Sequence, residues 1–383
     1  MLPHALPPFR LERWFTEFEF VPNMRNLTAS GPYDATTREV LALEDAETTR
    51  RYLDLGLGYI ENPGAASLRQ GISSLYRGLQ AEDVQIVSGA SEALFLLAWL
   101  VVEPGANIII EEPGYENLPG VSDALGLEVR RLPLRMEDNW HPDLERLARL
   151  IDDKTRLIYL VHPHNPTGSV LGTEEMQAIA RLAGRAGALL VNDEVFRLIA
   201  LDGQPTPSII DVVENAVSIG DMTKPWGLGG LRVGWLASHD HQLLERLSAA
   251  RDYSTMCSSA PGEFLAELVL RHADELLAPR LAAARTNRAI LASTIAQAGE
   301  HFQGLPTWRR PEAGYTAFVQ LPFAAEPFCR HLALRRHILL LPGSVFGPAY
   351  ERFVRVGIGG DTTQFQEGME ILLDELLHWQ QPA

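Results

Sequence analysis

The chain carries the stretch Asp221-Met222-Thr223-Lys224-Pro225-Trp226-Gly227-Leu228-Gly229-Gly230-Leu231-Arg232-Val233-Gly234-Trp235. Lys224 follows an apolar run at residues 216–220, and Arg232 comes eight residues later, after a glycine-rich turn. A lysine held on rigid structure and partly desolvated keeps a neutral amine, which can attack a carbonyl. An arginine close by can hold a phosphate through two parallel hydrogen bonds. The stretch therefore predicts a lysine nucleophile beside a phosphate clamp, with a solvated loop lysine as the alternative.

Composition limits the class of protein. A chain of 383 residues with 46% apolar residues suggests about two domains and a large core. The net charge of −16 argues against nucleic acid as a partner, because phosphate contacts need clustered Lys and Arg. Two cysteines, Cys257 and Cys329, make no disulfide framework and fit a reducing cytosol. Residues 1–10 do not resemble a signal peptide, and no apolar run of about 18 residues predicts a membrane span.

Short apolar runs alternate with helical patterns through the first two thirds of the chain. We predict helices at 92–102 and 174–186, and strands at 84–87, 107–110, 127–132, 156–161, 188–192, 216–219 and 231–236. This alternation indicates an α/β domain with a mostly parallel sheet and helices on both faces. Sites in such sheets lie beyond the carboxyl ends of the strands.

The pattern changes after Asp240 to that of a smaller α+β unit. We predict helices at 242–250, 263–270, 275–298 and 363–379 and strands at 315–321 and 353–358, with the helix at 275–298 bridging the two units. The chain is accordingly divided into a large domain at 46–280, a small domain at 281–383 and an N-terminal segment at 1–45 that joins the small domain.

Three polar groups follow predicted strands. Ser88-Gly89-Ala90-Ser91 opens a helix, so it is either an anion site or an ordinary helix cap. Asp193 ends a strand, where a buried carboxylate needs a cation such as a protonated pyridine nitrogen, or else caps the next helix. Asn165 precedes Pro166 in a candidate cis peptide. Its neighbours His162 and His164 have no third ligand nearby, so no metal is expected.

With these motifs in this order, the chain resembles the class I/II aminotransferases of the aspartate-aminotransferase-like, fold type I superfamily, from Leu27 to the C-terminus. The glycines at 227, 229 and 230 do not join a strand to a helix, so they do not indicate a dinucleotide site. The resemblance implies pyridoxal 5′-phosphate (PLP) as cofactor, a large domain with a mostly parallel sheet and a smaller α+β domain.

The resemblance also implies residue roles. Lys224 is expected to form the Schiff base, Asp193 to contact the pyridine nitrogen and Asn165 the 3′-oxygen, and Tyr115 to stack on the ring. The phosphate is expected to be bound by Ala90, Ser91, Thr223 and Arg232, and by Tyr59 of a second subunit. Arg355 is expected to bind the α-carboxylate of the substrate. Tyr59 implies a homodimer with its sites at the interface.

Two positions depart from the family pattern. Phe196 stands where most members have a tyrosine that donates to the 3′-oxygen, so that oxygen keeps only Asn165. Asp221 stands where most members have serine, and a carboxylate near a phosphate is repulsive unless it is protonated or turned to a cation. Departures of this kind at a site are often functional.

In these departures the chain resembles a branch of the superfamily that acts on arginine and hydroxyarginines. That branch includes oxidases and the capreomycidine and enduracididine cyclases. Thr16-Glu17-Phe18-Glu19-Phe20 resembles the substrate-contacting segment of that branch, with Thr16 and Glu19 at the substrate and Glu19 at a cationic group. The alternative for this segment is a solvated amphipathic helix.

Two functions remain open at this point. The first is an aminotransferase that acts on a free L-amino acid through Lys224. The second is a PLP-dependent lyase, cyclase or oxidase on an arginine-type amino acid, which uses the same core residues. A third function, a PLP sensor fused to a DNA-binding module, is not favoured, because the roughly thirty residues that precede the core are not basic enough for such a module.

Overall fold

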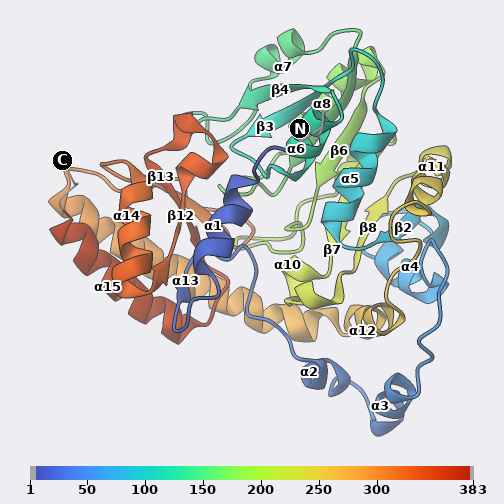
Figure 1. Cartoon of the computed structure of the whole chain (residues 1–383), viewed down its shortest axis with the longest axis horizontal. Helices are drawn as coiled ribbons and strands as arrows, with labels where there is room; N and C mark the ends of the chain where they lie inside the picture. Colours follow the sequence, from blue (N-terminus) through green and yellow to red (C-terminus); the bar gives the residue numbers. More distant parts are fainter. Residues whose placement is uncertain (1–5, 380–383) are drawn as a thin grey trace.

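The computed structural model describes residues 6–379 and shows an α/β molecule with two main sheets (Figure 1). Residues 1–5 of the predicted N-terminal segment (1–45) and residues 380–383 of the predicted small domain (281–383) lie outside the described residues. The prediction of an α/β fold with a large, mostly parallel sheet is confirmed.

The large sheet has the strand order β2-β8-β7-β6-β5-β3-β4. β8 runs antiparallel to both of its neighbours, and the pairs from β7 to β4 are all parallel. Its central strands are apolar runs without alternation, as expected where helices cover both faces. The strands are β2 (Val84–Val87), β3 (Asn107–Glu112), β4 (Glu128–Pro133), β5 (Thr155–Val161), β6 (Leu189–Asp193), β7 (Ala216–Asp221) and β8 (Gly234–Ala237).

Two apolar clusters fill the two faces of this sheet. One cluster includes side chains of α4 (Ala66–Ser73), α8 (Thr173–Ala186) and α12 (Ala260–Arg271). The other includes side chains of α5 (Ala90–Leu100), α6 (Asn117–Ala124) and α11 (His241–Arg251). The helices therefore cover both faces, and the carboxyl ends of the parallel strands remain open for a site.

The second unit has a four-stranded sheet in the order β12-β13-β10-β9, covered by helices. These strands are β9 (Thr307–Trp308), β10 (Thr316–Gln320), β12 (Leu341–Pro342) and β13 (Phe353–Gly357), and the helices include α14 (Ala325–His331) and α15 (Thr362–His378). The long helix α13 (Ala273–His301) packs against α15 at one part and against α10 (Thr223–Trp226) and α12 at another, so it bridges the units as predicted (Figure 1).

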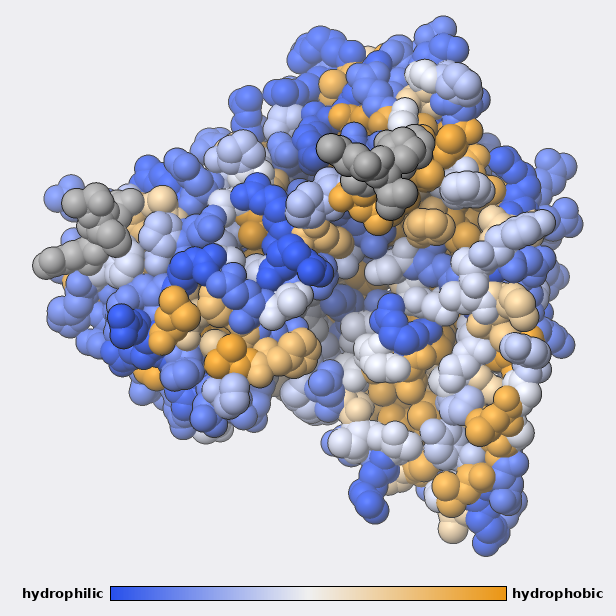
Figure 2. Space-filling model, viewed as in Figure 1, coloured by the Kyte–Doolittle hydropathy of each residue, from blue (hydrophilic) through white to orange (hydrophobic). Residues whose placement is uncertain are grey.

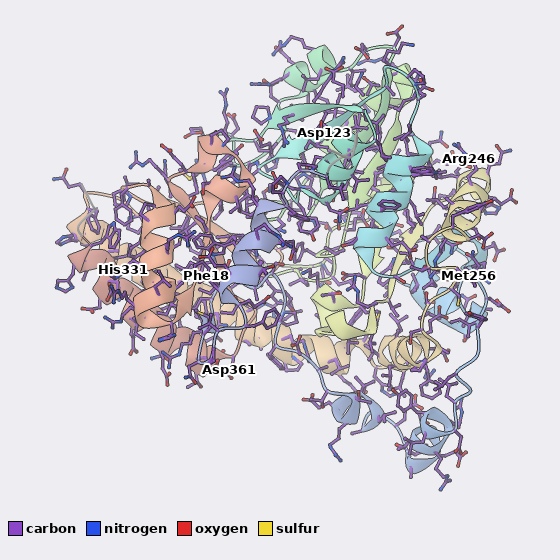
Figure 3. All side chains as sticks on the ribbon, in the orientation of Figure 1. Phe18, Asp123, Arg246, Met256, His331 and Asp361 are labelled. Carbon is purple, nitrogen blue, oxygen red and sulfur yellow. The ribbon has the colours of Figure 1, made fainter. Side chains whose placement is uncertain are left out.

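The N-terminal helix α1 (Arg10–Phe18) packs on this second unit. Leu11, Trp14 and Phe18 are buried there, and Trp14 Nε1 donates to Leu340 O at 2.9 Å. Phe18, labelled in Figure 3, lies under the Arg330 guanidinium, which is 5.4 Å from its ring centroid. β1 (Arg25–Asn26) then pairs with β11 (Ile338–Leu339). These contacts fix the segment that carries Glu19 at the edge of the second unit.

Most predicted elements agree with the structure to within a few residues, but the strand at 231–236 is wrong in its first half. Residues Gly229–Leu231 form a 3₁₀ turn, Arg232 has a left-handed φ of 52°, and β8 begins at Gly234. A left-handed residue cannot continue a strand, and here it turns the Arg232 side chain toward Ser88. Among residues 6–379, no helix is long and apolar enough to cross a membrane.

Candidate functional site

A cavity of about 730 Å³ opens beyond the carboxyl ends of β5, β6 and β7 and is closed on its other side by α1 and β13. It brings together almost all of the predicted site residues, which come from segments far apart in the chain. Those that line it are Glu19, Ala90, Ser91, Tyr115, Asn165, Asp193, Phe196, Asp221, Thr223, Lys224, Arg232 and Arg355.

Lys224 lies in the first turn of α10, directly after β7, with its amine in the cavity. Its Nζ donates to Ser30 Oγ at 3.1 Å and lies 5.9 Å from the centroid of the Phe196 ring. Burial lowers the pKa of Lys224, although the carboxylate of Asp221 opposes that shift. The site therefore favours a neutral, nucleophilic amine, as the sequence predicted for this lysine.

An anion cup forms where β2 meets α5. We define it as residues 88–91 together with Arg232. The N–H groups of Ala90 and Ser91 open α5 and have no partner within the helix. Arg232 Nη2 donates to Ser88 O at 3.2 Å. Gly89 has a φ of +77°, and a Cβ there would lie 2.4 Å from Arg232 Nη2, so this guanidinium position requires glycine.

Asp193 ends β6 and is buried. Its Oδ2 accepts a hydrogen bond of 3.0 Å from the Tyr159 hydroxyl, and its Oδ1 accepts one of 3.2 Å from the Val195 N–H. Burial raises the pKa of Asp193 to about 7, against the effect of these donors. A buried acid of this kind is suited to pair with a cation inside the cavity.

Asp221, the second departure from the family pattern, is buried at the end of β7. Its Oδ1 accepts the N–H groups of Thr223 and Lys224, each at 3.1 Å, so it caps the short helix α10. Burial raises the pKa of Asp221, and the nearby Lys224 opposes this. The carboxylate is thus turned toward backbone N–H groups and a lysine rather than left facing an anion.

Arg355 on β13 is buried, with 2% of its surface exposed. Its Nη2 donates to Thr28 O at 2.9 Å and its Nη1 to Asn165 Oδ1 at 3.3 Å. Within residues 6–379 its hydrogen bonds go to no carboxylate, and burial lowers the pKa of Arg355 to about 10. A buried cation without a counter-ion is costly, so this guanidinium is suited to bind a carboxylate from solution.

Besides Asp193 and Asp221, three further carboxylates line the same cavity: Glu12 and Glu19 from α1 and its end, and Asp34 from the following loop. We call them the acidic wall. Burial and the charges of Glu12 and Asp34 raise the pKa of Glu19, although Asn26 Nδ2 donates to its Oε1 at 3.1 Å. Glu12 Oε1 also accepts a 3.5 Å hydrogen bond from the Tyr115 hydroxyl. The cavity thus contains both a buried cation and a group of carboxylates, and none of these carboxylates is hydrogen-bonded to Arg355.

Two predicted residues do not reach this cavity. Thr16 lies on α1 beside the helix face that carries Glu12 and Glu19, so its side chain is exposed. Its hydroxyl donates to Glu12 O at 2.7 Å. Tyr59 is 87% exposed in the loop after α3 (Ala46–Leu53), away from the cavity of its own chain. A Tyr59 role at this site therefore requires a second subunit.

The motif around Asn165 folds as a buried loop. The Asn165-Pro166 bond is cis, as predicted. His162 Nε2 pairs with Glu111 Oε1 at 2.8 Å and His164 Nδ1 with Thr167 Oγ1 at 2.8 Å, so both rings pack within the protein.

Sequence reasoning missed several residues of the site, among them Glu12, Ser30, Asp34 and Tyr159. Ser30 and Asp34 lie in an irregular segment without a periodic signal. Tyr159 gave the clearest available signal, since it is the one polar side chain in the run 157–161 and lies in register beside β6. Glu12 shares a helix face with Glu19, a relation that follows once residues 10–18 are taken as a helix.

The donor set fits a phosphorylated pyridine aldehyde. The cup with its glycine-dependent guanidinium suits a phosphate, the buried Asp193 suits a protonated ring nitrogen, and the amine of Lys224 suits an aldehyde carbon. These three groups line one cavity, so a single ligand can contact all of them.

Comparison with known proteins agrees with this chemistry. Capreomycidine synthase of Streptomyces vinaceus is 32% identical over 378 residues, which are 98% of this chain and 95% of that protein. A PLP-dependent aminotransferase from Streptococcus suis matches with a TM-score of 0.91 and 28% identity over 99% of this chain and all of that one. The PLP-dependent cyclase OrfR matches with a TM-score of 0.86 and 29% identity over 98% and 99% of the two chains.

The family model of aminotransferase class I and II matches residues 25–372. This span includes both main sheets and every lining residue of the cavity except those that precede residue 25. The chain belongs to the aminotransferase class I and II family, whose cofactor is pyridoxal 5′-phosphate.

Proposed function

We propose that the protein is a PLP-dependent enzyme that acts on a free arginine-type L-amino acid, and that it performs an elimination or cyclisation. The observation that carries the proposal is the pairing of opposite charges in one cavity. Arg355 is buried and, among residues 6–379, hydrogen-bonds to no carboxylate, and the acidic wall lines the same space. A molecule with a carboxylate at one end and a guanidinium at the other satisfies both.

In this proposal the protein holds the cofactor through the residues of the cavity. The anion cup and Thr223 bind its phosphate, Asp193 pairs with its ring nitrogen, Asn165 donates to its 3′-oxygen, Tyr115 stacks on its ring, and Lys224 attaches it covalently. When bound, PLP withdraws electrons from the Cα of an amino acid. Phe196 offers no hydroxyl to the ring, and Asp221 orients the turn that carries Lys224.

The substrate is held at two ends. Arg355 binds the α-carboxylate with Asn165 alongside, and Thr28 fixes the guanidinium plane through its carbonyl and hydroxyl oxygens. Glu19, Glu12 and Asp34 bind the distal cation. Because its pKa is lowered, the Lys224 amine accepts the proton that leaves Cα and can return it. In this scheme Thr16 does not contact the substrate, and it contributes only as part of α1, the helix that positions Glu12 and Glu19.

The relatives support an arginine-type reaction over plain transamination. One relative that covers 98% of this chain is a capreomycidine synthase, and a structural neighbour is described as a PLP-dependent cyclase. Transamination is the second candidate, and the aminotransferase match with a TM-score of 0.91 favours it. Both reactions use the same core residues. An elimination or cyclisation requires a leaving group at Cβ or Cγ, such as the hydroxyl of a hydroxyarginine, whereas transamination moves only the proton of Cα and needs no leaving group.

A single half-reaction separates the two candidates. The holoenzyme is mixed with arginine, hydroxyarginine, citrulline or alanine without any keto acid, and the visible spectrum is followed. An eliminating or cyclising enzyme returns to its starting spectrum and releases product, whereas accumulation of the amine form of the cofactor shows transamination. Glu19→Gln should raise the KM for arginine and leave that for its uncharged isostere citrulline unchanged. Equal effects on both would contradict a role of the acidic wall in binding a cation.

We also propose that the protein is a cytoplasmic homodimer in which Tyr59 reaches the phosphate of the partner's cofactor. Leu53 at the end of α3 is 74% exposed, and Leu57 and Tyr59 in the loop that follows are 83% and 87% exposed. Figure 2 shows hydrophobic side chains at the surface around α2 (Thr37–Leu41) and α3. Exposed apolar side chains of this size favour burial in an interface. The free cysteines Cys257 and Cys329 fit a reducing compartment. Sedimentation of the holoenzyme at micromolar concentration checks the dimer.

A further inference from the structure

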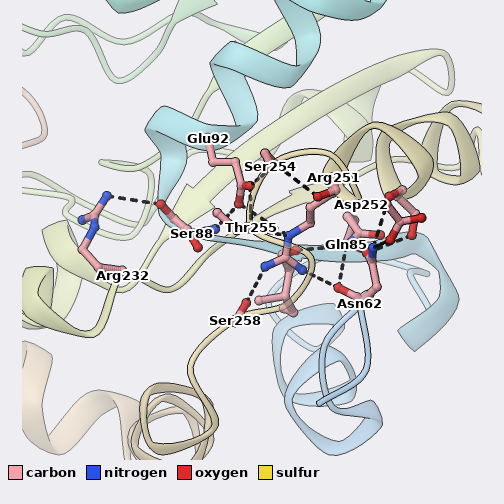
Figure 4. Close-up of polar contacts among 12 residues, drawn as sticks. Asn62, Gln85, Ser88, Glu92, Arg232, Arg251, Asp252, Ser254, Thr255 and Ser258 are labelled. Carbon is pink, nitrogen blue, oxygen red and sulfur yellow. Dashed lines mark hydrogen bonds and ion pairs between the residues drawn. The ribbon is translucent and has the colours of Figure 1, made fainter. Parts of the chain in front are cut away.

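Glu92 and Arg251 form a buried ion pair behind the anion cup (Figure 4). Glu92 Oε2 lies 3.5 Å from Arg251 Nε, and their side chains are 8% and 0% exposed. Neither residue lines the cavity. A buried ion pair is costly to form and contributes little to stability on its own, so its contacts show what it holds in place.

Glu92 holds the cup. Its Oε2 accepts the Ser88 N–H at 2.6 Å, and Ser88 O in turn accepts from Arg232 Nη2 at 3.2 Å. The backbone of Ser88 is thus held at both its N–H and its carbonyl group. The other carboxylate oxygen accepts the hydroxyls of Ser254 and Thr255 at 2.8 and 2.7 Å. Burial would raise the pKa of Glu92, but these donors and Arg251 keep it below its ordinary value.

Arg251 holds a second segment. Its Nη1 donates to Asn62 O, which also accepts from Gln85 Nε2 at 3.1 Å. The Asn62 side chain is fixed as well: its Nδ2 donates to Asp252 Oδ1 at 2.7 Å and its Oδ1 accepts the Ser248 hydroxyl at 2.9 Å. Asn62 therefore has a fixed backbone and a fixed side chain at the end of the exposed loop that carries Tyr59.

We propose that Glu92 and Arg251 are positioning residues. Within one subunit they hold the anion cup and the loop that carries Tyr59 (the Tyr59 loop) in one rigid arrangement. The Tyr59 loop of that subunit completes the anion cup of the partner. The inference rests on the proposed homodimer and on the Tyr59 contact with the partner's phosphate. The contacts run without a break from Arg232 through Ser88, Glu92 and Arg251 to Asn62, three residues from Tyr59. Cofactor affinity at both sites of the dimer then depends on each Glu92–Arg251 pair.

Hybrid dimers test this inference. Two differently tagged chains are co-expressed and the mixed dimer is purified. One chain carries Lys224→Ala, so that only the other chain attaches the cofactor covalently. Glu92→Gln is placed either in the chain with Lys224 or in the chain without it. The measurement is the PLP dissociation constant at the Lys224-bearing site, from titration of the cofactor-free dimer by the visible band of lysine-bound PLP.

Both hybrids should bind PLP more weakly than the hybrid without the Glu92 change, each by roughly tenfold, the scale of one lost charge-assisted hydrogen bond. In the first hybrid the cup itself is loosened, and in the second the loosened Tyr59 loop comes from the other chain. Weakening only in the first hybrid would overturn the inference, since Glu92 would then act on its own cup alone. A hybrid that keeps the dimer mass and the circular dichroism spectrum of the unchanged hybrid is folded, so its weaker PLP binding is not a general folding defect.

Three further chains complete the experiment. Glu245→Gln, an exposed carboxylate of α11, should leave PLP binding unchanged in both positions. Arg251→Met in the chain without Lys224 removes the donor to Asn62 O and should weaken PLP binding as Glu92→Gln does, and no effect there would contradict the role of the pair. Tyr59→Phe in the Lys224→Ala chain should weaken PLP binding. If it does not, the proposed Tyr59 contact fails together with this inference. If Tyr59→Phe weakens PLP binding but Glu92→Gln in the chain without Lys224 does not, only this inference is overturned.

Discussion

The Tyr159 hydroxyl donates a 3.0 Å hydrogen bond to Asp193 Oδ2, and both side chains are buried at neighbouring strands of the large sheet. Burial raises the pKa of Asp193 to about 7, and this hydrogen bond opposes the shift. Tyr159 therefore favours the ionised form of Asp193, the acid that we propose faces the cofactor ring.

We predict that Tyr159→Phe weakens cofactor binding. Without the donor, the pKa of Asp193 rises further and its pairing with a protonated ring nitrogen is lost in part. A hydrogen bond to a charged group contributes about 1.5–3 kcal/mol, which corresponds to a rise of roughly 10- to 100-fold in the PLP dissociation constant. Titration of the cofactor-free protein measures it. An unchanged constant would show that Tyr159 only packs against Asp193.

The stability of the cofactor-free protein should fall with rising pH because of Asp193. The folded-state pKa of about 7 lies above the ordinary value of 3.8, so the stabilising contribution is complete below pH 3.8 and is lost as pH rises through 7. Melting temperatures at pH 5 and pH 8 check this. Asp193→Asn, which cannot ionise, should reduce the difference between the two, and the same difference in that variant would contradict the assignment.

Lys224→Ala should abolish covalent attachment of the cofactor. The wild-type protein should be yellow, and borohydride should fix PLP to the peptide that contains Lys224, as mass spectrometry can show. The variant should keep PLP without a covalent bond, because the anion cup and Asp193 are intact. A borohydride-stable adduct on another lysine would refute this role.

Arg355→Gln should weaken the binding of the amino acid and leave PLP in place. A bidentate pair between Arg355 and a carboxylate contributes roughly 1.5–3 kcal/mol, so the KM should rise about 10- to 100-fold. Spectral titration with substrate at saturating PLP provides the measurement. Loss of PLP together with a normal KM would instead place Arg355 in the cofactor site.

Phe196→Tyr should restore a donor to the 3′-oxygen of the cofactor. Because a hydrogen bond to the ionised oxygen favours that form, the visible band of lysine-bound PLP should titrate at lower pH in the variant than in the wild type. We also expect more transamination relative to elimination with arginine-type substrates. If neither the titration nor the product ratio changes, Phe196 serves only in packing against Gly314 and the cavity wall.

The sequence by itself determined the helices and strands whose apolar residues follow a regular spacing, and the polar residues at the ends of those strands. Apolar runs without alternation predicted the buried parallel strands, and Lys224, Asp193 and the Ser88–Ser91 turn were found because each follows such a run. The parallel arrangement gathers strand ends at one edge, so their proximity also followed from the pattern. The error at 231–236 arose because periodicity does not show the left-handed φ of Arg232.

Only the tertiary structure decided the remainder of the site. Glu12, Ser30 and Asp34 reach the cavity because α1 packs on the small unit through Leu11 and Trp14 and the chain then returns past Lys224. Tyr159 meets Asp193 because β5 and β6 pair in one register. The Glu92–Arg251 pair likewise joins residues 159 positions apart. Local sequence encodes which face of an element is apolar, whereas contacts between distant elements depend on how all of those faces pack at once.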